Sequence, residues 1–185
     1  MSLKRTYVPG EGYRSIVAAG EGGLAFSELG MLTLPAGGTG TLESGDRETA
    51  LIALTGSCSV TAKGLGCVEI GGRRTVFDGP THLVYLPRRS GAIRVVAGAA
   101  GVELAVCRSA ATGDCPARLI TPAEVKTVSI GEGCYRREAL LILDERFAAS
   151  RLFIGEAIVP GGNWASWPPH RHDYDNLPEE VDMEE

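Results

Sequence analysis

Short apolar runs of four to six residues, separated by turns that contain glycine or proline, recur from residue 31 to residue 107. The runs favour β-branched residues, and this length is typical of strands rather than of bundle helices. Their connections are too short for helical crossovers, so the strands must pair antiparallel. We predict an all-β domain over about residues 25–110, a jelly-roll-like β-barrel that protects its edges. The predicted strands are 31–34, 50–55, 58–62, 81–86, 92–96 and 102–107.

The composition supports a globular chain and excludes several classes of function. The 185 residues are 44% hydrophobic and 22% charged, which is enough apolar material for a core. A net charge of −5 argues against nucleic acid or an anionic membrane as a partner. Five cysteines without a C-x-x-C pair predict reduced, small core residues rather than disulfides. No signal-peptide-like or membrane-spanning run occurs, so we predict a cytoplasmic protein.

A second β unit is predicted to begin after a small, polar linker at 109–116. Thr121-Pro-Ala-Glu124 has the pattern of a single helical turn, with Thr as N-cap, Pro first and Glu third. Segments 125–130, 139–143 and 151–159 then predict extended structure. We therefore predict an N-terminal domain at 1–115 and the incomplete start of a second domain at 116–185.

The candidate chemistry lies in Pro168-Pro-His170-Arg-His172-Asp173. Residues two apart on a strand share a face, so His170 and His172 can present two imidazoles to one ion. With a later carboxylate they would suit Zn²⁺, Mn²⁺, Fe²⁺ or Ni²⁺; the alternative is an exposed turn with two solvated histidines. The remaining histidine, His82, lies in an apolar run and is predicted to be structural.

Three arginine pairs could bind a substrate carboxylate, although solvated surface charge is the default interpretation of each. Nothing resembles a phosphate-binding loop or an activated serine or cysteine nucleophile. Catalytic and substrate-binding residues are therefore left unassigned. The pairs are Arg73-Arg74, Arg88-Arg89 and Arg136-Arg137.

One long segment closely resembles the central motif of the 5-deoxy-glucuronate isomerase family of bacterial myo-inositol breakdown. It reads Gly155-Glu-Ala-Ile-Val-Pro-Gly-Gly-Asn-Trp-Ala-Ser-Trp-Pro-Pro-His-Arg-His-Asp173. The resemblance is specific from about residue 118 to the end and looser across the first β domain. Its other parts are Arg118-Leu-Ile-Thr-Pro122, Gly131-Glu-Gly, Asp175-Asn-Leu-Pro and Met183-Glu-Glu185.

The resemblance implies two cupin (jelly-roll) domains, the first degenerate and the second holding one divalent metal ion. In the related 5-keto-4-deoxyuronate ketol-isomerases the ligands are the two histidines of H-x-H, a following Glu and a later His. Carried onto this chain, they implicate His170, His172 and Glu185, with Glu184 as the competitor. No His follows His172. We therefore expect a truncated chain whose second barrel stays open and could pair with another chain as a homo-oligomer.

The implied reaction is the aldose–ketose isomerisation of 5-deoxy-glucuronate to 2-deoxy-5-keto-gluconate, with a small sugar acid as the substrate. A divalent ion would stabilise the enediol-like intermediate, and a general base would move the proton. Glu156 and Asp173 are base candidates only by their nearness to the motif. Two alternatives stay open: a non-haem iron cupin dioxygenase, and a metal-free cupin that binds a sugar acid without turnover.

Overall fold

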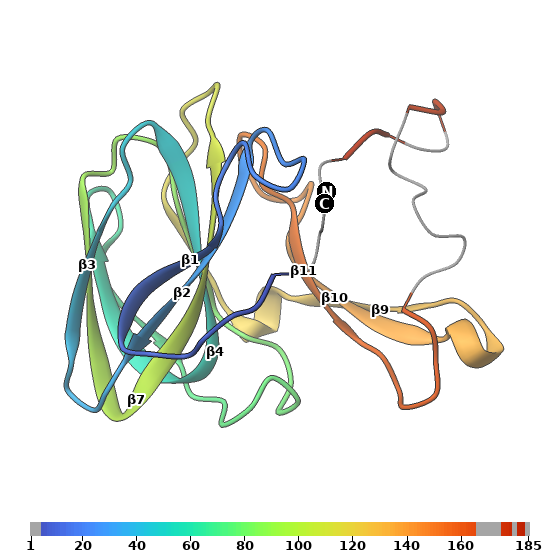
Figure 1. Cartoon of the computed structure of the whole chain (residues 1–185), viewed down its shortest axis with the longest axis horizontal. Helices are drawn as coiled ribbons and strands as arrows, with labels where there is room; N and C mark the ends of the chain where they lie inside the picture. Colours follow the sequence, from blue (N-terminus) through green and yellow to red (C-terminus); the bar gives the residue numbers. More distant parts are fainter. Residues whose placement is uncertain (1–4, 166–174, 179–180, 184–185) are drawn as a thin grey trace.

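The chain folds into two antiparallel β-sheets joined by short connections (Figure 1). The computed structural model describes residues 5–165, 175–178 and 181–183. One sheet carries eight strands and the other three. The strands of the larger sheet are β1 (Gly12–Val17), β2 (Ser27–Leu34), β3 (Thr39–Glu43), β4 (Arg47–Ala62), β5 (Gly66–Gly71), β6 (Leu83–Leu86), β7 (Ala92–Ala110) and β8 (Arg118–Ile120). The smaller sheet holds β9 (Lys126–Ile130), β10 (Arg137–Leu143) and β11 (Ile154–Ile158), with one-turn 3-10 helices η1 (Pro122–Glu124) and η2 (Gly133–Tyr135) beside β9.

Two long strands, β4 and β7, fold the larger sheet over on itself. One half of each long strand lies in the strand order β1-β2-β7-β4-β6-β8. Along the other half, β3 pairs with β7 and β5 pairs with β4. The register between β4 and β7 shifts after Ala53 and again after Gly56. These irregularities bend the strands, so each strand contributes to both layers of a jelly roll. The expected all-β, jelly-roll fold is confirmed, and neither sheet closes on itself within the residues that the structure describes.

The bend requires glycine at two facing positions. Gly56 has φ +72° and Gly101 has φ +77°, a region that side chains rarely adopt. A Cβ on Gly56 would also lie 2.1 Å from the carbonyl oxygen of Gly101. The close approach of β4 and β7 at the bend therefore depends on the absence of side chains there.

The sequence predicted strand content well but placed several strand ends wrongly. Runs 50–55 and 58–62 are one strand, β4, and runs 92–96 and 102–107 are one strand, β7. The glycines that were taken to end these strands instead sit at bulges, because a bulge keeps the ladder going across an irregular residue. The four strands β1, β3, β5 and β8 were not predicted.

The main core fills the space between the two layers. It consists of aliphatic side chains that alternate along the strands, including Leu32, Leu51, Val60, Ile93 and Leu104, all almost completely buried. Before the register shift, alternation along β4 puts the odd-numbered Leu51 and Ala53 into this core, and after it the even-numbered Cys58 and Val60. In the first half of β4, the even-numbered Ala50 and Ile52 point to the opposite face of the same sheet.

A second apolar cluster covers that opposite face and joins the two sheets. Ala50, Ile52, Leu83 and Tyr85 of the larger sheet pack there with Ile142 and Leu143 of β10. Partly buried residues of the 147–154 segment complete the cluster. Strand β8, which begins beyond the predicted linker, pairs with β6. The boundary between domains at 115/116 stays a prediction.

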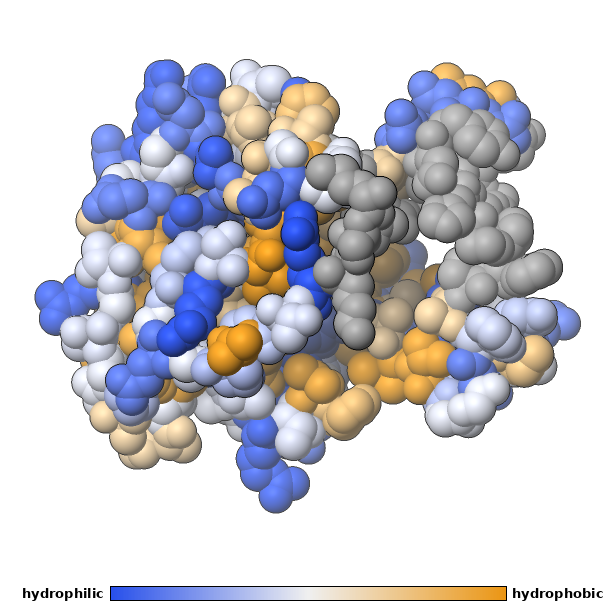
Figure 2. Space-filling view, viewed as in Figure 1, coloured by the Kyte–Doolittle hydropathy of each residue, from blue (hydrophilic) through white to orange (hydrophobic). Residues whose placement is uncertain are grey.

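The smaller sheet has one face toward the barrel and one face without a covering layer in the described chain. Register places Val128, Ala139 and Ala157 in one row of the uncovered face, and Ile130 lies on that face beside them. Figure 2 shows apolar side chains gathered over this sheet.

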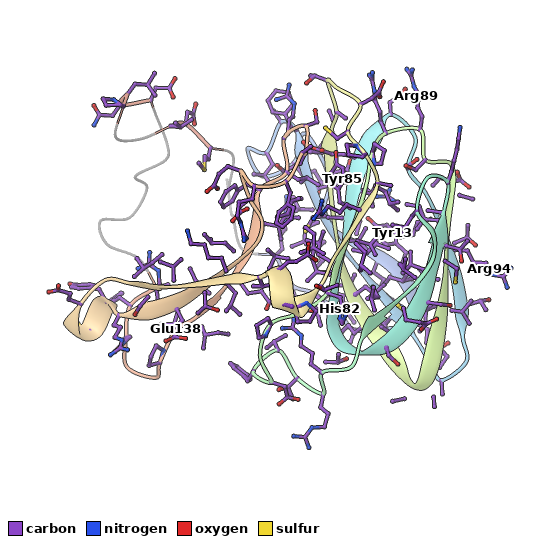
Figure 3. All side chains as sticks on the ribbon, turned by 180° about the vertical axis from the view of Figure 1, so that it is seen from behind. Tyr13, His82, Tyr85, Arg89, Arg94 and Glu138 are labelled. Carbon is purple, nitrogen blue, oxygen red and sulfur yellow. The ribbon has the colours of Figure 1, made fainter. Side chains whose placement is uncertain are left out.

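A buried carboxylate holds the segment before β11 against the barrel. The Glu48 side chain is completely buried and accepts hydrogen bonds from the backbone N–H groups of Ser150 (2.8 Å), Arg151 (2.7 Å) and Leu152 (2.9 Å). The Tyr85 hydroxyl donates a fourth bond, at 2.8 Å. Burial has the largest effect and the hydrogen bond to the Glu48 carboxylate the next largest; both raise the pKa of Tyr85. Tyr85 therefore stays a neutral donor, and Figure 3 shows it on the side of the barrel next to that segment.

Local predictions around the linker and the cysteines had mixed outcomes. The single turn at 121–124 is confirmed as η1, and the Glu124 carboxylate accepts bonds from the Thr121 N–H and hydroxyl. These bonds and Arg118 lower the pKa of Glu124 to about 2.

All five cysteines are free; Cys58 is a core residue, whereas Cys67 and Cys134 are exposed, so the core prediction is wrong for these two. Within the described chain no helix has the length and hydrophobicity to cross a membrane.

Replacing Glu48 tests how far the two sheets depend on this carboxylate. We expect Glu48→Gln to lower the free energy of unfolding by about 3 kcal/mol, because three buried N–H groups lose a charged acceptor. Tyr85→Phe removes one bond only and should cost about 1 kcal/mol. Urea unfolding measures both. Glu69→Gln, an exposed change on β5, is the control; an equal loss in Glu48→Gln and Glu69→Gln would contradict the assignment.

Candidate active-site groove

A groove of about 510 Å³ separates the barrel from the smaller sheet. One wall is the loop between β5 and β6, which contributes Val76, Phe77, Gly79 and Pro80. The other wall comes from β9, β10 and β11 and from the turn that follows β11. Residues Thr127, Arg136, Arg137, Glu138, Leu140, Ile158 and Pro160 line that wall. The family-like motif begins at Gly155, so its first residues help to form this groove.

Arg73 connects the two walls. Its Nε donates to the carbonyl of Ala53 (3.0 Å), and one terminal nitrogen donates to the carbonyl of Gly79 (3.0 Å). Both terminal nitrogens bind the carboxylate of Glu156 on β11. The Arg73 side chain is 5% exposed and that of Glu156 is 17% exposed. A nearly buried, bidentate ion pair therefore fixes β11 against the β5–β6 loop.

This finding corrects the default interpretation of the arginine pairs. Arg73 is buried, whereas its neighbour Arg74 is 90% exposed. Arg88 and Arg89 pair with surface carboxylates, Asp114 at 2.7 Å and Asp46 at 2.9 Å, as expected of solvated charge. The sequence gives no local signal for Arg73, because its partner lies 83 residues further on.

The remaining arginine pair lies in the groove. Arg136 and Arg137 both line it, and within the described residues neither guanidinium has an ion-pair partner. The nearest groove-lining carboxylate in sequence is Glu138, which is exposed on β10 (Figure 3). A guanidinium group binds carboxylates through paired, charge-assisted hydrogen bonds. The groove can therefore hold a small acid.

The chain that follows β11 is fixed beside η2 as it approaches the histidine motif. The side-chain amide of Asn163 donates to the carbonyl of Arg136 at 2.7 Å, and the Trp164 N–H donates to the carbonyl of Cys134 at 2.8 Å. These bonds bring the motif's first half alongside the groove wall that carries Arg136.

The predicted metal ligands lie outside the described residues. This applies to His170, His172 and Glu185, to the competitor Glu184, and to the base candidate Asp173. Among the residues that the structure does describe, no group of three or more His, Cys, Asp or Glu side chains is arranged to hold a metal ion. Two imidazoles with a carboxylate nevertheless form a donor set suited to a divalent transition metal.

The other two candidates have structural partners. His82 accepts a hydrogen bond at Nδ1 from the Gly71 N–H (3.3 Å), and burial lowers its pKa, so the predicted structural role is confirmed. It precedes β6 rather than lying within it. The carboxylate of Glu156 is occupied by Arg73, so it is poorly placed to act as a free general base.

A double-mutant cycle tests the link between the two walls. We expect Arg73→Gln and Glu156→Gln each to destabilise the fold by about 3 kcal/mol, since each leaves a nearly buried charge unpaired. The coupling between the two changes should be about 2 kcal/mol in urea unfolding. Arg74→Gln, which alters an exposed side chain, should change stability by less than about 0.5 kcal/mol. Additive effects at Arg73 and Glu156 would show that the ion pair contributes nothing.

Two similar curated proteins carry the same name. A 5-deoxy-glucuronate isomerase of Geobacillus kaustophilus is 40% identical over 144 residues, which is 77% of this chain and 51% of that protein. The Bacillus subtilis (strain 168) 5-deoxy-glucuronate isomerase is 34% identical over 165 residues, or 88% of this chain and 60% of that one. The chain thus spans little more than half the length of these curated relatives.

A solved structure shares the fold. The crystal structure of an IolB-like protein from Salmonella typhimurium LT2 matches 94% of this chain and 65% of its own, with a TM-score of 0.84 and 31% identity. The model of the KduI/IolB family matches residues 9–185. That match extends through the barrel, the groove and the histidine motif, so the chain belongs to the KduI/IolB family.

Proposed function

We propose that the protein converts 5-deoxy-glucuronate to 2-deoxy-5-keto-gluconate in the breakdown of myo-inositol. The observation that carries this proposal is family membership over residues 9–185 together with relatives of 34–40% identity that are named 5-deoxy-glucuronate isomerase. The groove supports the proposal, because its volume of about 510 Å³ suits a small ligand. Two of the residues that line it, Arg136 and Arg137, are arginines. The cytoplasmic location and a homo-oligomer stay predictions.

A divalent metal ion is part of this proposal. His170, His172 and Glu185 would hold it, with Glu184 as the alternative carboxylate, and the donor set suits Zn²⁺, Mn²⁺, Fe²⁺ or Ni²⁺. Such an ion supplies a Lewis acid that polarises the sugar's oxygen atoms and stabilises negative charge. Pro168-Pro169 ahead of the histidines restricts the backbone there.

Arg136 and Arg137 have the role of binding the substrate's carboxylate. The isomerisation moves a proton between two carbons at the sugar's carbonyl end, so the carboxylate at its other end does not react. Holding that carboxylate fixes the orientation of the reacting carbons and lowers the entropy that the reaction must lose. Arg137 begins β10 and is only half exposed, which limits its movement.

Arg73 and Glu156 have a positioning role in the same proposal. Their ion pair fixes β11, and β11 leads directly into the turn at 160–163 and the motif beyond it. The general base is left unassigned. Of the two candidates, Asp173 has the advantage, because the carboxylate of Glu156 is committed to Arg73.

Metal analysis of the purified chain tests the proposed centre. We expect about one divalent ion per chain in the wild type and none above background in a His170→Ala/His172→Ala variant, because two imidazole ligands are lost. Conversion of 5-deoxy-glucuronate, followed by NMR, should disappear in the same variant. Oxygen consumption by an iron-loaded chain would instead indicate the dioxygenase. Sugar-acid binding that persists in chelator without turnover would indicate the metal-free binder.

The groove has its own test. Arg137→Gln should weaken binding of 5-deoxy-glucuronate by roughly tenfold, since one charge-assisted carboxylate contact is lost. Isothermal titration calorimetry measures the affinity, and metal content should not change. Arg74→Gln, on an exposed part of the β5–β6 loop, is the matched control. Unchanged affinity in Arg137→Gln would remove that residue from the substrate site.

A further inference from the structure

A second hollow lies at one end of the first barrel, away from the histidine motif in the sequence. It has a volume of about 360 Å³ and is formed around the turn that joins β3 to β4. Asp46 in this turn pairs with Arg89, which Figure 3 shows at the edge of the barrel. The lining residues are Glu43, Ser44, Gly45, Asp46, Arg47 and Arg108.

Arg108 brings an unused cationic group to this hollow. Its Nε is buried without a hydrogen-bond partner, and no carboxylate in the described chain forms an ion pair with it. Its guanidinium carbon lies 5.5 Å from the centre of the Tyr13 ring, which orients the group. The neighbouring Arg47, by contrast, pairs with Glu28. Glu28 lies opposite Arg108 in the β2–β7 register, but its carboxylate pairs with Arg47, so Arg108 has no ion-pair partner among the described residues.

Two buried hydroxyl groups near Arg108 also lack partners. Ser44 is 2% exposed and lines the hollow, and its Oγ has no hydrogen-bond partner. Thr49 is completely buried, its Oγ1 is likewise unpartnered, and it lies directly opposite Arg108 in the β4–β7 register. An unpaired buried polar group costs about 1–3 kcal/mol, so three of them around one end of the barrel need a physical reason. Each of the three is a hydrogen-bond donor.

The surrounding charges limit the kind of acceptor. Asp46 and Glu28 are neutralised by Arg89 and Arg47. Glu43 lies exposed on the rim, and its negative charge disfavours a dianion close by. The ligand group that best fits one guanidinium and the hydroxyl groups is one that carries a single negative charge shared by two oxygen atoms. That description matches a carboxylate rather than a phosphate.

We propose that Arg108, Ser44 and Thr49 form a binding site for the carboxylate of a small organic acid in the first barrel. The guanidinium of Arg108 carries the charge, the two hydroxyl groups complete the coordination, and Tyr13 holds Arg108 in place. This site shares no residue with the groove or with the set of proposed metal ligands, and it does not depend on isomerase activity.

Calorimetric titration of the full chain with acetate, glucuronate and inorganic phosphate tests the site. At about 10 mM ligand, even millimolar affinity is detectable. Arg108→Gln should weaken carboxylate binding by roughly tenfold or more, because a charged hydrogen-bond donor is lost. Thr49→Val should weaken it by about threefold, since a neutral donor contributes less. Arg94→Gln makes the same charge change at an exposed position of the same strand and should bind like the wild type.

Thermal unfolding distinguishes a lost site from a lost fold. Thr49→Val replaces an unpartnered buried hydroxyl by a methyl group, so its melting temperature without ligand should equal or exceed that of the wild type. Weaker acetate binding by this stable variant would support the site. Three results overturn it: no saturable carboxylate binding, equal binding by Arg108→Gln and Arg94→Gln, or tighter binding of phosphate than of acetate.

Discussion

The carboxylate of Glu48 holds together parts of the chain that are about one hundred residues apart. It accepts hydrogen bonds from three successive backbone N–H groups of residues 150–152 and from the Tyr85 hydroxyl. Backbone N–H groups in a loop must be paired when they are buried, and a carboxylate can pair several of them at once. Strand β11 starts two residues after this loop segment. The position of β11, and of everything that it carries, therefore depends on Glu48.

The two ends of this arrangement reinforce each other. Glu48 fixes the chain before β11, and Arg73 binds Glu156 within β11. Between them lies the apolar cluster of Ile52, Leu83 and Ile142, which is shared by both sheets. The apolar contacts supply most of the association, because burial of aliphatic surface is favourable in any orientation. The two carboxylates fix the orientation, because their hydrogen bonds have defined directions. The groove between the sheets is a product of that fixed orientation.

The structure thus contains two kinds of polar site: carboxylates whose hydrogen bonds are made within the protein, and donors whose acceptor is missing among the described residues. Between the barrel and the smaller sheet, the carboxylates of Glu48 on β4 and Glu156 on β11 both accept hydrogen bonds from the protein itself. At one end of the barrel, Arg108 Nε, Ser44 Oγ and Thr49 Oγ1 are buried polar atoms with no hydrogen-bond partner among the described residues. Substitutions at the first set should change folding, and those at the second set should change binding. This contrast separates the structural polar groups of the first barrel from the groups that we assign to a ligand.

Much about this protein follows from the sequence by itself. Runs of β-branched residues between glycines and prolines determine an antiparallel β fold, since the side-chain period and the connection lengths are local properties. The turn at Thr121–Glu124 is equally local, and the family follows from the sequence because its model matches residues 9–185. The tertiary structure alone decided that β4 and β7 continue through their glycines, because a bulge needs its partner strand. It also decided that Arg73 is buried and Arg74 is not, and that the Nε of Arg108 has no acceptor within the part of the chain that the structure describes. Burial and pairing at such positions arise from residues that are distant in sequence, and a charged residue's local pattern contains no information about them.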